Sequence, residues 1–386
     1  MAFLTRADDS YLAQWWWTID RKLLLLIIVA MVTGIFLVAT ASPPVASRIG
    51  LNEYHFIIRH IIILVPSFGM MLAVSFLNAR QIWRLSSVVL AGSFVLLIYV
   101  LLFGMEIKGA QRWVHLPGFS LQPSEFAKPA FIVVAAWFAA LKKERENFPG
   151  VKIVVGLYAF LAILLLSQPD MGMTFVVTCC LFSIIFLAGF PLRYIVVLMV
   201  IGIAALVMAY FSFSHVQSRV DRFINPEAGD TYQMDHSLAA FRQGGVVGVG
   251  PGQGSVKLSL PDAHADFVFS VAGEELGMVL TLIIILMYVL ILYRGFNHLY
   301  DNKNLFVILS AGGLLTMFGL QAFIHMGSAL HLIPAKGMTL PFLSYGGSSL
   351  LSISFAMGMV LGLTRRQSHN NMLKKSTSIR KINRHK

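Results

Sequence analysis

The chain has 386 residues, of which 57% are hydrophobic and 12% charged, and 30 Lys or Arg against 18 Asp or Glu give a net charge of +12. So apolar a composition excludes a soluble globular protein, in which about 25% of residues are charged. Apolar runs long enough to cross a bilayer recur along the chain. We count ten: 22–41, 56–77, 85–104, 124–141, 151–168, 171–189, 192–213, 266–293, 304–327 and 345–364. They predict one all-α integral membrane domain, 22–364, because an open sheet cannot face lipid.

The positive charges favour one orientation. With ten spans both termini lie on the same side, and 20 of the 30 Lys and Arg then fall on that side. The positive-inside rule places both termini in the cytoplasm. The segment 1–21 is expected at the cytoplasmic interface, since Trp15, Trp16 and Trp17 precede cations. The tail 365–386 is basic and has no acid, so we interpret it as a disordered contact for anionic lipids, and we expect no nucleic acid partner.

Polar residues occur within the second and fourth spans and in the turn between the fifth and sixth. Arg59 needs a partner inside the membrane, and a structural ion pair is favoured over a substrate contact. Glu125 and Lys128 are three residues apart on one helix face, so we expect them to pair. The functional alternative is that Lys128 meets an anionic substrate group while Glu125 holds it. The turn SQPDMGMT, 167–174, is explained by turn chemistry alone.

Two long outer segments follow. The first, 214–265, contains Arg219, a predicted helix over 233–242 and a glycine-rich run over 244–254. This run lacks the pattern of a nucleotide-binding loop and no strand precedes it, so we expect its backbone to lie flat at the membrane surface or to approach a lipid headgroup. The second carries Lys336, which either reaches an anionic headgroup or anchors the chain at the interface.

The stretch 257–277, KLSLPDAHADFVFSVAGEELG, joins a polar, turn-like loop to the eighth span. Helical spacing places Asp266 on one polar or small face with Ser270, Gly273, Glu274 and Gly277. A carboxylate held there on a rigid element suits a general base. The alternative is that Asp266 caps the helix N-terminus, where its charge favours the dipole.

Four motifs resemble one family in order and spacing. They are KGAQRW with QPSEFAKP (108–129), QPDMG (168–172), YQ with GPGQG and LPDAHADFVFSVAGEELG (232–277), and PAKGMTLPFLSYGGSSLL (334–351). Together with ten spans they resemble the SEDS family of shape, elongation, division and sporulation proteins. The last motif resembles the family's division member more than its elongation member, which is the runner-up.

The resemblance implies a peptidoglycan glycosyltransferase that polymerises lipid II outside the bacterial cytoplasmic (inner) membrane. A class B penicillin-binding protein is the implied transpeptidase partner, with other divisome membrane proteins at the septum. The family's essential acid falls on Asp266, and its common Glu and Lys fall on Glu125 and Lys128. His325 and Ala329 stand where members often have Asn, and Met173 where Thr is usual, so no substrate contact is assigned to the ninth span.

The implied reaction displaces a lipid pyrophosphate with a sugar hydroxyl. Pyrophosphate is a good leaving group, so one carboxylate suffices and the configuration inverts, whereas inverting glycosidases need two. Cations must offset the charge of the leaving group. We expect no tightly bound cofactor and no protein metal site; Mg²⁺ carried with the substrate is the alternative. Besides Asp266, substrate contacts are assigned to Arg112, Gln122, Ser124, Glu125, Lys128, Arg219 and Lys336.

Two other functions compete with this one. In the first, the protein is a transporter that flips lipid-linked precursors across the membrane. This alternative is motivated by ten spans with intramembrane charges such as Glu125, Lys128 and Glu274. A flippase requires charges along a path to the cytoplasmic side, but most ionisable residues cluster at the outer ends. In a non-catalytic division scaffold, Asp266 would act as a helix cap only.

Overall fold

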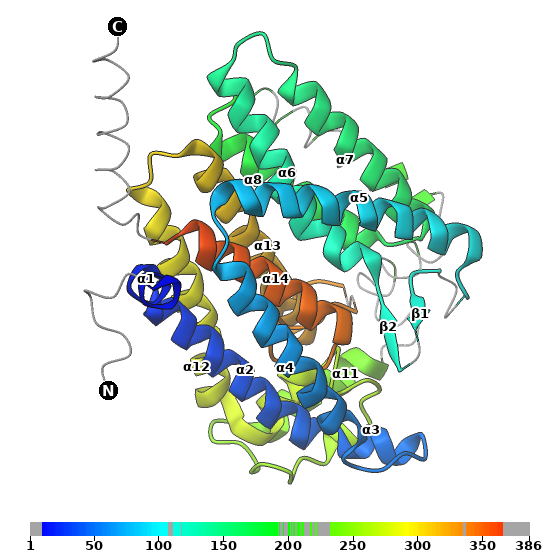
Figure 1. Cartoon of the computed structure of the whole chain (residues 1–386). Coiled ribbons are helices and arrows are strands. Elements are labelled where there is room, and N and C mark those ends of the chain that lie inside the picture. The colour runs from blue at the N-terminus through cyan, green and yellow to red at the C-terminus, as the bar shows by residue number, and fades with distance from the viewer. Residues whose placement is uncertain are drawn as a thin grey trace, which may run out of the picture.

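The computed structural model describes residues 10–106, 111–116, 118–191, 232–334 and 337–365, with scattered positions between 192 and 231. Long helices dominate this part of the chain and run between two ends of a bundle (Figure 1). They are α2 (Arg21–Ala41), α4 (His55–Ser75), α5 (Ala79–Phe103), α6 (Pro123–Glu144), α7 (Gly150–Ser167), α8 (Met171–Leu187), α12 (Val268–Tyr300), α13 (Leu305–Ala329) and α14 (Gly347–Leu363).

The helical membrane fold expected from the sequence is confirmed. Seven of these helices are long and apolar enough to cross a bilayer, and α8 and α14 are shorter apolar helices. They fall on nine of the ten predicted spans, while the other, 192–213, lies largely outside the described residues. α5 begins six residues before its predicted start because Asn78 and Gln81 form a capping box ahead of the apolar run.

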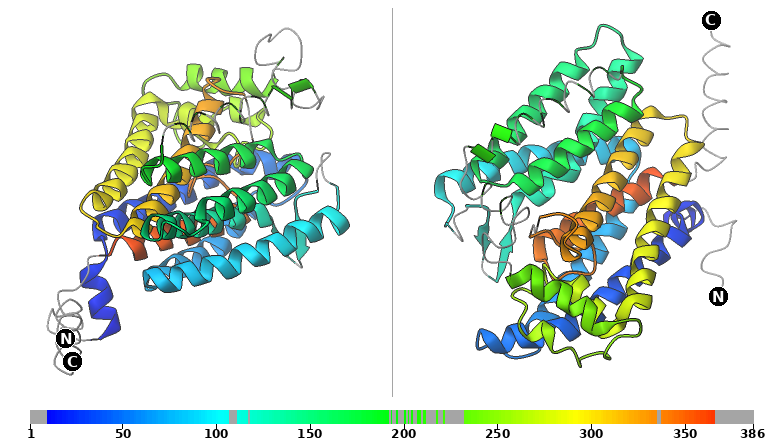
Figure 2. Two further views of the ribbon diagram at one scale, coloured as in Figure 1. Left: turned by 90° about the horizontal axis from the view of Figure 1, so that it is seen from above. Right: turned by 180° about the vertical axis from the view of Figure 1, so that it is seen from behind.

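Short elements mark the two ends of the bundle. The strands β1 (Val114–Leu116) and β2 (Phe119–Leu121), with α3 (Pro43–Arg48), α11 (Tyr232–Gly244) and the 3₁₀ turn η2 (Val256–Leu258), lie at one end, which we call the hairpin end (Figure 2). α1 (Tyr11–Thr18) lies at the other, the α1 end (Figure 1). The helix expected over 233–242 is confirmed, because α11 spans Tyr232–Gly244.

The β-hairpin is a feature that the sequence did not predict. Its strands are antiparallel, with His115 opposite Ser120, and Gly118 turns between them at φ +77°. Arg59 at the start of α4 donates a hydrogen bond to the Gly118 carbonyl at 2.8 Å. The ion pair expected for Arg59 is wrong as far as the described residues go, since this arginine holds the hairpin instead.

α6, α13 and α14 form the centre of the bundle. Most of their residues are buried, whereas α4, α5 and α7 expose most of theirs to the surroundings. α14 packs on α4, α6 packs on α5 and α13, and α12 packs on α2 and α13. The outer ends of α6 and α14 therefore meet inside the protein rather than at its lipid-facing surface.

Trp15 and Asp20 fasten the α1 end. The Trp15 indole donates to Ser75 Oγ at 2.9 Å and stacks on Phe76. Asp20 caps α2 and accepts hydrogen bonds from Arg294, at 2.7 Å, and His298 on α12. Burial alone would raise the pKa of Asp20, but these two bonds outweigh it and hold the pKa well below its usual value.

Candidate active site

Asp266 lies in a turn just before α12. Its backbone N–H donates to the Asp262 carbonyl at 3.0 Å, and its side chain is partly exposed. The N-cap of α12 is Phe267, and no side chain hydrogen-bonds to the first turn of this helix. The capping alternative for Asp266 therefore has no support in the geometry of this helix end.

The polar face expected for the start of α12 is not open. Ser270 Oγ lies 2.6 Å from Ser237 Oγ of α11, and the Phe241 ring of α11 packs against Gly273. The prediction that this face carries Asp266 is wrong, because Asp266 precedes the helix and α11 covers the face. Gly277 also leaves the helical conformation, with φ +73° and ψ −176°, and breaks α12 in two.

The glycine-rich run packs against this break. Met278 N donates to the Gly245 carbonyl at 2.9 Å, and Val249 N donates to the Glu274 carbonyl at 3.0 Å. A Cβ on Gly248 or Gly277 would overlap the opposing backbone, so glycine is required at both positions. The run therefore supports the kink in α12, and its expected position at the membrane surface or beside a lipid headgroup stays a prediction.

Glu274 and Glu275 have partners inside the protein, although Glu275 Oε2 is buried without a hydrogen bond among the described residues. The Glu274 carboxylate accepts the backbone N–H groups of Val256, at 2.7 Å, and Lys257, at 2.9 Å. The Lys257 ammonium pairs with Glu275 and donates to the Thr40 carbonyl at 2.9 Å. Lys257, the first residue of the stretch 257–277, is buried at 4% exposure, whereas the next residue, Leu258, is 56% exposed.

The loop after α13 faces Asp266. A Cβ on Gly337 would lie 3.2 Å from Asp266 Oδ2, so the backbone of this loop passes beside the carboxylate. Tyr345 N donates to the His264 carbonyl at 2.9 Å, and the two rings are in contact. Burial lowers the pKa of His264 to about 4, so its imidazole is neutral at pH 7. Lys336, which precedes Gly337, lies outside the described residues.

The N-terminus of α14 connects this loop to α6. Thr339 Oγ1 lies 2.5 Å from Ser349 Oγ in the first turn of α14. The neighbouring Ser348 Oγ accepts from Gln122 N at 3.0 Å and donates to the Ser120 carbonyl at 2.9 Å. The turn that holds Asp266 and the start of α6 therefore lie on either side of one helix end.

The ion pair expected between Glu125 and Lys128 is confirmed. Lys128 Nζ lies 2.9 Å from Glu125 Oε2, and the side chains are 1% and 7% exposed. The two groups are not aligned for a hydrogen bond, and neither of these two atoms has a hydrogen-bond partner among the described residues. Ser124 Oγ is also buried without a partner, while Ser352 Oγ donates to the Glu125 carbonyl at 2.6 Å. Buried donors and acceptors left in this way point to a bound water or ligand.

Asp170 belongs to the same polar cluster. The interpretation of the turn 167–174 by turn chemistry alone did not predict this. Its carboxylate caps α8 through Met173 N at 3.3 Å, with Arg112 Nη1 at 4.0 Å. Arg112 also donates to the carbonyls of Gln168, at 2.9 Å, and Pro169, at 2.5 Å. Burial raises the pKa of Asp170, and the nearby charges of Arg112 and Lys128 offset this only in part. The one feature of the sequence that could have indicated this role is the position of an acid in a turn at the outer ends of two spans.

The structure thus divides the assigned site residues into three groups. Glu125, Lys128 and Asp170 form a buried cluster, Arg112 lies half-buried beside Asp170, and Gln122 and Ser124 are buried at the start of α6. Asp266 lies across the end of α14 from this cluster. Arg219 and Lys336 lie outside the described residues. Among the residues described, no group of three or more His, Cys, Asp or Glu side chains could hold a metal ion.

A multi-pass helical bundle with a buried ionic cluster and a partly exposed acid at one end defines a class of membrane proteins rather than a single activity. Residues 21–369 match the sequence model of the FtsW, RodA and SpoVE family, described as cell cycle proteins. The chain belongs to this family, the SEDS family, and is FtsW-like.

Relatives and solved structures agree with this membership. The chain is 39% identical over 363 residues to the probable peptidoglycan glycosyltransferase FtsW of Caulobacter vibrioides, covering 94% of this chain and 93% of that one. It is 35% identical over 342 residues to the FtsW of Geobacter metallireducens, covering 86% and 91%. A chain from a structure described as a peptidoglycan synthase complex coordinating polymerization and crosslinking aligns with TM-score 0.75 at 26% identity, over 90% and 97% of the two chains. Thermus thermophilus RodA aligns with TM-score 0.68 at 27% identity, over 92% and 99%.

Proposed function

We propose that this protein is a peptidoglycan glycosyltransferase that polymerises lipid II at the outer face of the bacterial cytoplasmic membrane. The proposal rests on membership of a family whose similar members are named for this activity. The observation that carries the catalytic assignment is the position of Asp266. Its carboxylate is partly exposed at the hairpin end, outside α12, beside a loop backbone that has no side chain at Gly337.

In the proposed step, Asp266 takes the proton from the hydroxyl of the incoming sugar. The hydroxyl oxygen bonds to the anomeric carbon of the other lipid-linked sugar as the bond from that carbon to the pyrophosphate oxygen breaks. The electron pair leaves with the lipid pyrophosphate, and the anomeric configuration inverts. No general acid is required, since pyrophosphate departs without protonation, in contrast to the alcohol that glycosidases release.

The buried cluster supplies positive charge near this step. None of the three ammonium hydrogens of Lys128 has a hydrogen-bond acceptor among the described residues, so a substrate oxygen would complete its hydrogen bonding. Arg112 lies beside Asp170 of the same cluster, and Gln122 and Ser124 are buried at the start of α6. We assign to these residues, with Arg219 and Lys336, the contacts to the sugar and pyrophosphate groups. If Mg²⁺ takes part, the substrate would have to supply most of its ligands.

We propose a class B penicillin-binding protein as the transpeptidase partner, because a synthase complex that combines polymerization with crosslinking contains a chain of this fold. Other divisome membrane proteins are expected at the septum. Division is favoured over elongation because the relatives at 35–39% identity are FtsW proteins, whereas the aligned RodA is 27% identical. Both termini are assigned to the cytoplasm, with the basic tail against anionic lipids.

The structure gives one argument against the flippase alternative. A flippase requires ionisable groups along a path toward the α1 end. The deeper acids on α12, Glu274 and Glu275, are occupied by Lys257 and by backbone N–H groups, which makes them part of the kink rather than of a path.

Reconstitution separates the three functions. Purified protein with its transpeptidase partner is given labelled lipid II in detergent, and the same protein in vesicles is assayed for lipid II exchange between leaflets. Glycan chains on a gel are the expected result. Exchange without polymer would assign a transporter, and neither polymer nor exchange would assign a scaffold.

A further inference from the structure

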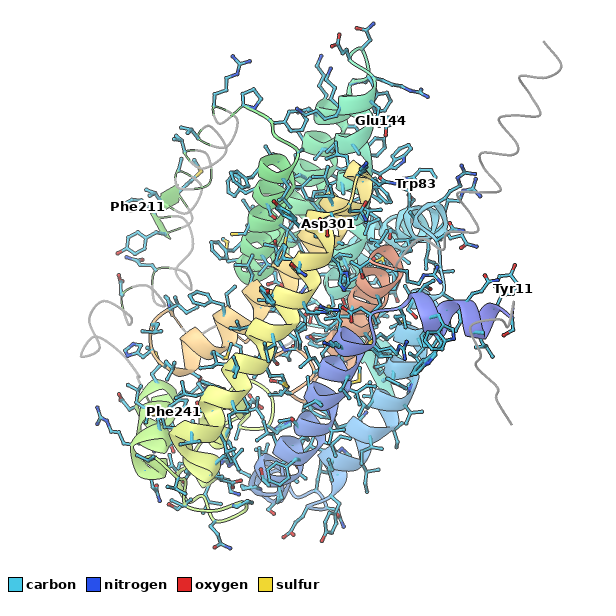
Figure 3. All side chains as sticks on the ribbon, turned by 90° about the vertical axis from the view of Figure 1, so that its left-hand side faces the viewer. Tyr11, Trp83, Glu144, Phe211, Phe241 and Asp301 are labelled. Atoms are coloured by element: carbon cyan, nitrogen blue, oxygen red, sulfur yellow. The ribbon has the colours of Figure 1, made fainter. Side chains whose placement is uncertain are left out.

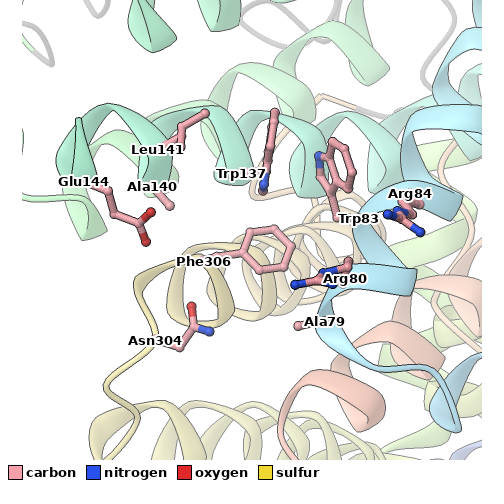
Figure 4. A pocket seen from close by; sticks show the side chains of 10 residues that line it. All are labelled: Ala79, Arg80, Trp83, Arg84, Trp137, Ala140, Leu141, Glu144, Asn304 and Phe306. Atoms are coloured by element: carbon pink, nitrogen blue, oxygen red, sulfur yellow. The ribbon is translucent and has the colours of Figure 1, made fainter. Parts of the chain in front are cut away.

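A cleft of about 460 Å³ opens at the α1 end, between the start of α5, the end of α6 and the start of α13. It lies far from the candidate active site, since Trp83 and Glu144 are at the opposite end of the bundle from Phe241 (Figure 3). Two tryptophans form one wall: the rings of Trp83 and Trp137 are 4.3 Å apart (Figure 4). Nothing in the proposed polymerisation step uses this cleft.

Three charged side chains line the cleft, and all are exposed. Arg80 and Arg84 come from the first two turns of α5, and Glu144 from the end of α6, on the opposite side (Figure 4). Within the described part of the chain none of them forms an ion pair or hydrogen bond. Cations at a helix N-terminus oppose the helix dipole, so the two arginines are unfavourably placed unless an anion binds between them.

The surface beyond the arginines is apolar. Val88, Val95 and Leu102 follow Arg84 at intervals that keep them on the same face of α5, and they are 70%, 67% and 69% exposed. A basic cleft at the membrane interface thus continues into an apolar stripe along the membrane-spanning helix. A peptide arriving from water would match the cleft but not the stripe.

We propose that this cleft binds the headgroup of an anionic glycerophospholipid, phosphatidylglycerol being the simplest bacterial case, with its acyl chains along α5. Arg80 and Arg84 bind the phosphate, and the two indoles border the glycerol region, as aromatic residues do at membrane interfaces. Glu144 faces the distal part of the headgroup. The net positive lining favours an anionic over a zwitterionic lipid.

Native mass spectrometry of the delipidated, full-length protein tests the proposal, with phosphatidylglycerol, phosphatidylethanolamine and phosphatidylcholine titrated separately. Each arginine near a membrane surface contributes a factor of about five to the attraction of anionic lipid, so Arg80→Gln with Arg84→Gln should weaken phosphatidylglycerol binding about 25-fold. The matched control is Arg145→Gln with Lys152→Gln, which removes two exposed charges near the same end but outside the cleft and should change binding little.

Glu144→Gln provides a second, independent measurement. With an anionic headgroup it removes a repulsion and should strengthen phosphatidylglycerol binding. The opposite result would be a wild-type protein that prefers phosphatidylethanolamine to phosphatidylglycerol, with Glu144→Gln weakening the binding of phosphatidylethanolamine. The ligand would then be zwitterionic and the proposal wrong. Equal binding of all three lipids by the wild type and the arginine variant would also overturn it and leave the cleft to a protein partner. Competition by glycerol phosphate alone would show that a free phosphate is the ligand.

Discussion

Glu125 and Lys128 show how a charge pair can be both structural and chemical. Both side chains are buried, and each lacks the hydrogen bonds that would normally offset the cost of removing it from water. A pair of this kind is maintained only where a partner completes it or where its specificity is needed. The proposed substrate contact of Lys128 supplies such a partner.

We predict that Glu125→Ala and Lys128→Ala are each strongly destabilising and that the double variant costs less than their sum. Removing one member leaves an unpaired buried charge, at a cost on the order of 3–5 kcal/mol. A double-mutant cycle on thermal unfolding in detergent measures the coupling. Strict additivity would exclude the pair and leave Lys128 as an independent phosphate contact.

Asp170 predicts a pH dependence of stability. Burial raises its folded pKa above the unfolded value of 3.8, so the folded state retains a proton that the unfolded state loses. Its contribution to stability is therefore greatest at low pH and falls as pH rises from the unfolded pKa through the folded one. Asp170→Asn should remove this loss and flatten the dependence of the melting temperature on pH. An unchanged slope would show that Asp170 is ionised throughout.

At the scale of elements, the kink of α12 organises the hairpin end. Gly277 breaks the helix, and the glycine-rich run pairs with the exposed backbone on either side of the break. The glycines are visible in the sequence, but their role at the kink could not be predicted from it. The close contact between the two backbones joins segments about 30 residues apart in the chain, so only the folded structure shows it.

We predict that Gly277→Ala unfolds this end of the protein. A left-handed backbone costs a residue with a side chain about 1–3 kcal/mol, and overlap with Gly248 adds to this. Gly92→Ala is the control: Gly92 lies inside α5 with open space around it, so alanine should be tolerated. Equal thermal stability of the two variants in detergent would contradict the assigned role of the kink.

Sequence patterns predicted the long helices because twenty or so apolar residues in a row have few alternatives in a bilayer. They missed the hairpin, since three-residue strands show no useful periodicity. They also missed the burial of Lys257 and Asp170. The partners of these residues, Glu275 and Arg112, are 18 and 58 residues away in the chain, so only the packed fold brings them together.

At the scale of the whole molecule, the charge distribution and the fold agree. The candidate active site lies at the hairpin end, while α1 and the end of α14, from which the basic tail continues, lie at the other (Figure 1). The proposed orientation therefore presents Asp266 to the outer face, where polymerisation would occur.

We predict that a phosphatase active only outside the cytoplasm is inactive when fused after Lys386. The same enzyme inserted at Gly252, in open space at the hairpin end, should be active. Activity at the C-terminus would reverse the orientation and place Asp266 on the wrong side of the membrane for the proposed reaction.

The central claim is that Asp266 is the general base. Asp266→Asn retains the shape of the side chain and removes its basicity, which should reduce the rate of lipid II polymerisation roughly 10²–10⁴-fold. Asp262→Asn is the control in the same turn: Asp262 has φ +51°, a conformation that asparagine also tolerates, so this variant should retain most activity.

The decisive measurement is the rate of polymerisation by these two variants, both purified with the transpeptidase partner in equal yield. The account predicts normal accumulation and partner binding for Asp266→Asn with almost no polymer, and near-normal polymer for Asp262→Asn. Polymerisation by Asp266→Asn at close to the wild-type rate would contradict it.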